Sequence, residues 1–143
     1  MELLFFAYRD FTAEADAVLA DFGFGRAHHR AVYFIGRNPG LSVNGLLGIL
    51  RITKQSLSRV LRQLIEEDFI VQRPDRNDKR RRLLYLTGKG GELEARLTKI
   101  QSKRIAKAYQ GAWEAAGGGS ARGFRAVLRN IINEEDRHRV GGE

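Results

Sequence analysis

The order of apolar and polar positions between residues 41 and 90 predicts two short helices and a hairpin. Ser42 and Thr53 are capping residues, and each begins a stretch with apolar residues at helical spacing. The apolar positions are Val43, Leu46, Leu47, Ile49 and Leu50 in the first helix, and Leu57, Val60, Leu61, Leu64 and Ile65 in the second. The second helix should be roughly 14 residues long. It leaves a polar, basic face outside: Lys54, Gln55, Ser56, Ser58, Arg59, Arg62 and Gln63.

Two short runs of strand-forming residues follow, at residues 69–73 and 83–86. The segment between them is rich in turn-forming residues, so the pair predicts a β-hairpin. Its tip is strongly basic, with Arg76, Lys79, Arg80, Arg81 and Arg82. Two helices with a tight break, followed by a basic hairpin, are typical of a winged helix-turn-helix. In that arrangement the second helix lies in the major groove of DNA.

Four further helices are predicted around this centre, at about residues 2–22, 26–36, 89–116 and 120–132. Gly23 should end the first, Thr87 should cap the third, and Ser120 should cap the last, after a glycine break at residues 117–119. The tail from Glu134 should be frayed. The first helix carries more apolar side chains than one core needs, which points to cover by a partner subunit. The expected fold is mainly α with a small β-hairpin wing.

Three motifs give the chain a resemblance to the MarR family of bacterial transcriptional regulators. They are the run at residues 53–59, Asp78-Lys79-Arg80 in the hairpin, and residues 86–90, which match the family's Leu-Thr-x-x-Gly at the exit of the wing. The resemblance implies a winged helix-turn-helix DNA-binding domain over residues 25–87. It also implies a helical dimerisation region built from residues 1–24 and 88–143. A family member's wing arginine enters the minor groove and is steadied by an aspartate, and Arg80 and Asp78 hold those positions here. An aspartate two residues away can hold the arginine's guanidinium fork by a bidentate ion pair, so we expect one between Asp78 and Arg80.

The positive charge of the chain is concentrated in the segment that carries these motifs. The net charge is +8, and residues 51–90 hold eleven Lys and Arg against five Asp and Glu. Residues 1–50 hold four against five. A basic surface that coincides with a helix-turn-helix pattern favours a polyanionic partner, so we expect double-stranded DNA.

The residue types on the second helix and the wing fit DNA contacts of two kinds. Glutamine can pair with adenine and arginine with guanine, so we expect Gln55 and Arg59 at base edges. Thr53, Lys54 and Ser56 should be shared between bases and phosphates, and Arg80 should enter the minor groove. At least one of Arg81 and Arg82 should contact the backbone. The expected set is completed by Ser42, Ser58, Arg62, Arg76, Asp78 and Lys79.

Several other chemistries are excluded by composition. The chain has no cysteine, so disulfides and thiolate metal sites are excluded. His28 and His29 are adjacent and would point about 100° apart on a helix, so we expect no metal site. We find no nucleophile–base set and no phosphate loop, and expect neither an enzyme nor a cofactor. No apolar run approaches the roughly 18 residues of a membrane span, and we expect a cytoplasmic protein.

The resemblance also implies a pocket between the dimerisation helices and the DNA-binding domain, for a small aromatic or carboxylate effector. The candidate side chains are Tyr8, Arg9, Phe11, His28, His29 and Tyr33. Packing within the core or the dimer is the alternative role for each of them.

These observations predict a homodimeric, sequence-specific transcriptional regulator, more readily a repressor than an activator, acting on a pseudo-palindromic operator. Two alternatives stay open at this point. One is an architectural DNA-binding protein without an effector, and the other is a winged-helix adaptor that binds proteins.

Overall fold

The computed structural model describes residues 1–116 and 119–140. It is mainly helical with one small antiparallel sheet, as the sequence predicts. The chain divides into two compact units, Met1–Ser102 and Lys103–Glu143. Within the described ranges, no helix is both long and apolar enough to cross a membrane.

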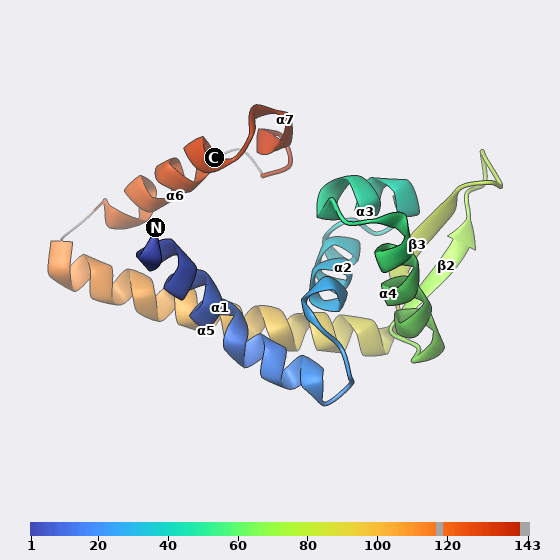
Figure 1. The fold of residues 1–143 in the computed structure, drawn as a ribbon, viewed down its shortest axis with the longest axis horizontal. Coiled ribbons are helices and arrows are strands. Elements are labelled where there is room, and N and C mark those ends of the chain that lie inside the picture. The colour runs from blue at the N-terminus through green and yellow to red at the C-terminus, as the bar shows by residue number, and fades with distance from the viewer. Residues whose placement is uncertain (117–118, 141–143) are drawn as a thin grey trace. The chain divides into compact units, whose positions relative to one another are not determined.

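The first unit contains the predicted helix-turn-helix and hairpin (Figure 1). In chain order its elements are α1 (Glu2–Ala20), α2 (Arg26–Arg37), β1 (Leu41–Ser42), α3 (Val43–Leu50), α4 (Lys54–Glu66), β2 (Ile70–Pro74), β3 (Arg82–Leu86) and the first part of α5 (Gly88–Ala116). The helix α1 ends two residues before the predicted boundary, and Gly23 follows with a φ of 66°.

One hydrophobic core joins these elements. The helix α2 packs against α3, α4 and β3, and α4 packs against β2. The core includes Ala15 and Leu19 from α1 and Leu93 and Leu97 from α5, so both of these helices are joined to the helix-turn-helix. The side chains that lie at its centre are Leu46, Leu57, Leu64, Phe69 and Leu84.

Two side chains of α4 differ from the prediction. Ile65 was expected inside but is 39% exposed, whereas Gln63 was expected outside but is half-buried. Leu57, Val60, Leu61 and Leu64 form a narrow stripe, and at about 100° per residue Ile65 falls about 90° from the centre of that stripe. Gln63 is covered because α2 lies against that side of the helix.

The sheet has the strand order β1-β3-β2, with both pairs antiparallel. The hairpin pairs Ile70 with Leu86 and Pro74 with Arg82, and β1 pairs Leu41 with Leu84. The strand β1 was not predicted, because a two-residue strand is too short for an alternating pattern to be read from the sequence.

The second unit contains the rest of α5, α6 (Ser120–Ile131) and α7 (Glu134–Arg137). The prediction that Ser120 caps α6 is wrong: the cap residue is Gly119, at a φ of 98°, and Ser120 is the first helical residue. A glycine accepts this left-handed conformation without strain. Residues 117 and 118 of the predicted break lie outside the described residues. In the tail expected to be frayed, Glu134–Arg137 form the short helix α7, whose first turn is acidic and complements the helix dipole. Residues 141–143 of that tail lie outside the described residues.

Candidate nucleic-acid interface

Local capping fixes the start of α4, which we call the reading helix. Thr53 is its N-cap residue, and the Thr53 hydroxyl accepts a hydrogen bond from the Ser56 amide at 3.1 Å. Ser42 caps α3 in the same way, through the Gly45 amide at 3.0 Å. Between the two helices, Arg51 adopts a left-handed conformation with a φ of 49°. The turn of the helix-turn-helix is therefore encoded by two capping side chains and one left-handed residue.

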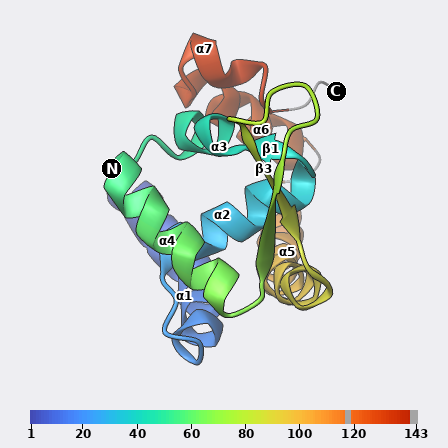
Figure 2. The ribbon, with the colours of Figure 1, turned by 90° about the vertical axis from the view of Figure 1, so that its right-hand side faces the viewer.

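The reading helix presents a polar face to solvent. Leu57, Val60, Leu61 and Leu64 are buried, so the opposite side of the helix is left free. The exposed side chains between residues 54 and 62 are all polar: Lys54, Gln55, Ser56, Ser58, Arg59 and Arg62. Figure 2 looks onto the end of the first unit where α4 and the hairpin both lie. The predicted base-contacting residues thus lie on one accessible face.

The wing loop, residues 75–81, is ordered by its own aspartates. Asp75 accepts a hydrogen bond from the Asn77 amide at 3.0 Å and forms an ion pair with Arg81 at 3.5 Å. Asp78 accepts a hydrogen bond from the Arg80 backbone amide at 3.0 Å. The expected fork between the Asp78 carboxylate and the Arg80 guanidinium is not among the interactions of the described residues. Asp78 orders the backbone before Arg80 instead, because a short side chain reaches an amide two residues on.

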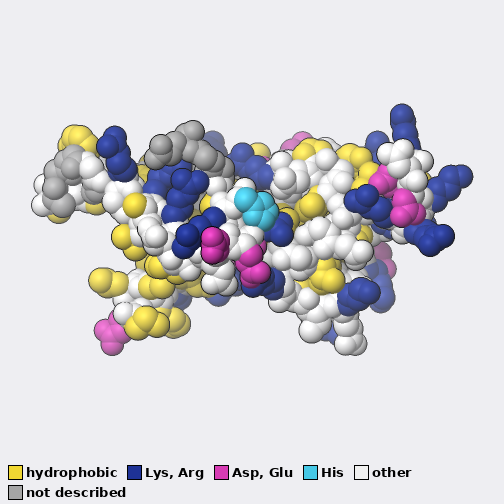
Figure 3. Space-filling model, turned by 90° about the horizontal axis from the view of Figure 1, so that it is seen from above, with side chains coloured by type: hydrophobic (Ala, Val, Ile, Leu, Met, Phe, Trp, Pro, Cys, Tyr) yellow, Lys and Arg dark blue, Asp and Glu magenta, His cyan; other side chains and the backbone are white. Residues whose placement is uncertain are grey.

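The wing loop and the adjoining Arg82 form a basic patch on the first unit. Arg76, Lys79, Arg80, Arg81 and Arg82 are all exposed, and Figure 3 shows Lys and Arg side chains gathered at the end of the first unit that carries the hairpin. Arg73, near the loop end of β2, lies over the ring of Tyr85, 5.1 Å from its centroid. A cluster of guanidinium groups favours phosphate and the edges of a narrow groove.

The six effector candidates lie on α1 and α2 and have different partners. The Tyr8 hydroxyl accepts a hydrogen bond from Arg30 at 2.8 Å, and Arg9 pairs with Asp10 at 2.7 Å. Phe11 on α1 is half-buried, and the ring of Tyr33 on α2 packs edge-on against the ring of Phe34. Burial lowers the pKa of His28 and of His29, which favours the neutral imidazole. His28 contacts the reading helix, a role that the sequence did not indicate.

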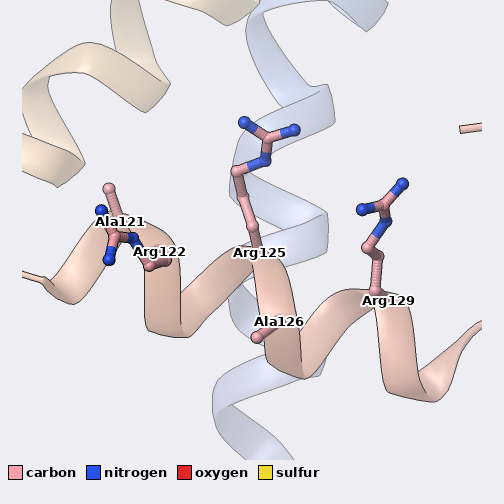
Figure 4. A pocket seen from close by; sticks show the side chains of 5 residues that line it. All are labelled: Ala121, Arg122, Arg125, Ala126 and Arg129. Atoms are coloured by element: carbon pink, nitrogen blue, oxygen red, sulfur yellow. The ribbon is translucent and has the colours of Figure 1, made fainter. Parts of the chain in front are cut away.

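A hollow in the second unit is lined by one helix, α6. Figure 4 shows the residues around it, Ala121, Arg122, Arg125, Ala126 and Arg129. None of them is among the six effector candidates. Three guanidinium groups beside one hollow favour anionic molecules. Over residues 1–116 and 119–140, no group of three or more His, Asp or Glu side chains is arranged to hold a metal ion.

The sequence missed the contact between His28 and Gln63 and the ion pair between Asp75 and Arg81. The first joins residues 35 apart in the chain, and no local pattern marks such a contact. The second had a weak signal, because aspartate and arginine at the two ends of a turn often pair.

Two capped helices, a three-stranded sheet and a basic hairpin at one end of a core define a winged helix-turn-helix protein. The family model described as MarR family matches residues 22–81. The HTH-type transcriptional regulator PetP of Rhodobacter capsulatus is 48% identical over 133 residues, which cover 93% of this chain and 78% of the relative. The chain therefore belongs to the MarR family of transcriptional regulators, and the prediction of family and fold is confirmed.

Solved structures share the fold at lower identity. A MarR transcriptional regulator from Methanosarcina mazei has a TM-score of 0.73 at 21% identity, with 91% of each chain covered. A SlyA-like transcription regulator from Listeria monocytogenes has a TM-score of 0.72 at 21% identity, with 92% of this chain and 87% of that chain covered. MepR, a transcription regulator of the Staphylococcus aureus multidrug efflux pump MepA, has a TM-score of 0.71 at 20% identity, with 91% of this chain and 96% of that chain covered.

Proposed function

We propose that the protein is a homodimeric repressor that binds a pseudo-palindromic operator in double-stranded DNA and is released by a small effector. One observation carries the proposal: the exposed polar face of the reading helix and the basic wing loop lie at the same end of one unit. A duplex offers a major groove and a neighbouring minor groove at the spacing that such a pair reads. Residues 25–87 would then be the DNA-binding domain.

The DNA contacts divide into base reading and backbone binding. Gln55 and Arg59 are exposed on the reading helix and would meet base edges, with Lys54 and Ser56 nearby. Arg80 would enter the minor groove, since the Asp78 carboxylate orders the backbone at this point. Arg81 is engaged by Asp75, which favours Arg82 as the phosphate contact.

Exposed apolar side chains on the terminal helices support the dimer. On α1, Leu3 is 88% and Phe5 is 63% exposed, and in the second unit Trp113 is 63% and Ile131 is 60% exposed. Large apolar groups at this density on a small protein mark an interaction surface. A second copy of the chain would cover them, and a two-fold axis would then place two reading helices about one helical turn of DNA apart. Residues 1–24 and 88–143 would form this dimerisation region.

The effector would be a small aromatic or carboxylate molecule that contacts residues from the set Tyr8, Arg9, Phe11, His28, His29 and Tyr33. This set supplies aromatic faces and one guanidinium, which suit such a molecule. Calorimetric titration with salicylate, which has an aromatic ring and a carboxylate, would test this effector site. A Tyr33→Ala variant serves as the comparison.

Selection of bound sequences from a randomised duplex tests the function directly. We expect an enriched palindrome and binding that weakens steeply with salt, because many phosphates are neutralised. Binding without an enriched sequence would support an architectural protein, and no binding at low salt would support an adaptor.

Two arginine substitutions separate base reading from backbone binding. Arg59→Ala and Arg80→Ala should each cost about 1–3 kcal/mol of operator affinity, and Arg59→Ala should relax base preference more. Arg37→Ala, at an exposed arginine that ends α2 outside both the DNA-contact set and the dimerisation region, is the matched control. An Arg59→Ala loss that is equal on operator and random duplex would refute base reading by that residue.

A further inference from the structure

The imidazole of His28 has a contact at each ring nitrogen and a third contact on its ring face. The Gly25 amide donates a hydrogen bond to Nδ1 at 3.1 Å. Nε2 lies 2.9 Å from Oε1 of Gln63 on the reading helix. The flat face of the ring stacks on Phe24, with centroids 4.7 Å apart and planes at 7°. His28 therefore connects the start of α2 to the last turn of α4.

The contacts assign the proton on the ring. A backbone amide only donates, so Nδ1 must be the unprotonated acceptor. The neutral ring then carries its hydrogen on Nε2, which donates to the Gln63 oxygen. The Gln63 amide nitrogen in turn donates to the Glu67 carboxylate at 3.4 Å. The result is a one-way chain of hydrogen bonds from Gly25 to the C-cap residue of the reading helix.

The chain lies beside a junction where the elements of the first unit meet. Phe22 and Phe24 from the turn after α1 pack edge-on against Phe69 at the start of the hairpin. Lys89 of α5 lies 4.2 Å from the centre of the Phe69 ring, and its ammonium donates to the Glu67 carbonyl at 2.7 Å. The end of the reading helix is thus held by contacts from α2, α5 and the α1–α2 turn.

We propose that His28 in its Nε2-protonated neutral form is a positioning residue that holds the reading helix in the orientation needed for DNA, and that protonation of His28 weakens DNA binding. This inference rests on the proposed function. A proton on Nδ1 would face the Gly25 N–H, so two donors would oppose each other and the hydrogen bond would be lost. The Gln63 contact would remain, but the ring would lose the hydrogen bond that fixes its orientation at the start of α2.

The charges around the ring favour its neutral form only in part. Burial opposes the proton and lowers the pKa of His28, whereas the hydrogen bond to Gln63 and the carboxylate of Glu67, the C-cap residue of α4, favour the proton. The α1–α2 turn contributes the aromatic rings of Phe22 and Phe24, and α5 contributes the Lys89 ammonium, which is bound to the Glu67 carbonyl. His29 provides a natural comparison, because it is also half-buried but is influenced by Asp16, Arg30 and Glu94 instead.

The first test is operator affinity against pH at constant ionic strength, between about pH 8 and pH 5, where histidine titrates. Wild type and His29→Gln should lose about five- to tenfold in affinity over this range, the scale of one hydrogen bond left unmade. His28→Gln has an amide that donates to Gln63 and does not titrate, so its affinity at neutral pH should be retained and the loss should disappear. A pH dependence in His28→Gln equal to that of wild type would overturn the proposal.

The second test needs no DNA. The ¹⁵N shifts of the His28 imidazole at neutral pH should show an unprotonated Nδ1 and a protonated Nε2. His28→Phe keeps the stack on Phe24 but has no ring nitrogens, and amide hydrogen exchange at residues 63–67 should become faster while α6 is unchanged. The opposite tautomer, or unchanged exchange, would overturn the positioning role. If wild type bound no duplex, the proposed function would fail, and these measurements would still decide the structural part.

Discussion

Gly90 offers a sharp test of how the wing is joined to α5. It is buried in the first turn of α5, and a Cβ added there would lie 2.0 Å from the carbonyl oxygen of Phe69 and 3.0 Å from its carbonyl carbon. A Cβ contact shorter than 3.0 Å essentially never occurs. Substitution by alanine must therefore push α5 and the start of β2 apart by about 1 Å, a close-packing strain that the backbone has to absorb.

The cost can be worked out from the groups that move. The Phe69 carbonyl accepts hydrogen bonds from the Thr87 amide at 3.1 Å and from the Thr87 hydroxyl at 3.2 Å. Overpacking costs about 1–3 kcal/mol, and weakening these bonds adds about 1 kcal/mol. Alanine regains roughly 0.5–1 kcal/mol over glycine inside a helix. Gly90→Ala should therefore lower the free energy of unfolding by about 2 kcal/mol, or roughly 5–10 °C in Tm.

Gly91 provides the matched control, because a Cβ there would meet nothing within 4 Å. Gly91→Ala should stabilise the protein by roughly 0.5–1 kcal/mol, since only the helix preference changes. Urea denaturation followed by circular dichroism measures both variants, with calorimetry for Tm. Equal responses of the two variants would refute the reasoning, because they would show that the approach to the Phe69 carbonyl does not limit the residue type at position 90.

Three further changes test other parts of the molecule. Thr53→Ala should lower the free energy of unfolding, measured by urea denaturation, by about 1 kcal/mol because the helix cap is lost. Thr53→Ser keeps a capping hydroxyl and should retain most of that stability. Equal stability of Thr53→Ala, Thr53→Ser and wild type would argue against the cap. Burial lowers the pKa of His28 and His29, so the unfolded chain binds their protons at higher pH than the folded chain does. The free energy of unfolding should therefore be highest above the ordinary histidine pKa of about 6.5 and should fall as the pH drops from 6.5 to the lowered pKa values. A variant with both His28→Gln and His29→Gln should show a smaller dependence of this free energy on pH. Phe5→Asp and Ile131→Asp should each weaken self-association in sedimentation experiments, and an unchanged mass would exclude those faces from the dimer.

The local features of the DNA-reading region were predictable because each depends on residues close together in the chain. Thr53 caps an amide three residues on, and the apolar stripe of α4 repeats every three or four residues. The two strands of the hairpin flank a turn-rich segment, so their antiparallel pairing follows from the turn. The motif at residues 86–90 was recognised from the sequence, but the sequence did not explain why its last residue, Gly90, is a glycine.

The contacts that join the elements were decided by the tertiary structure. Position 90 requires glycine because the Phe69 carbonyl, 21 residues earlier in the chain, leaves no room for a Cβ. Gln63 is half-buried because His28, on another helix, contacts it. In the wing, the family resemblance and the spacing favoured an ion pair between Asp78 and Arg80. The loop conformation instead directs Asp78 to a backbone amide and pairs Arg81 with Asp75. Periodicity and capping act over a few residues, and therefore the sequence by itself determined the elements and their order. Which side chains meet between elements depends on how the helices and strands pack, and only the folded chain decides that.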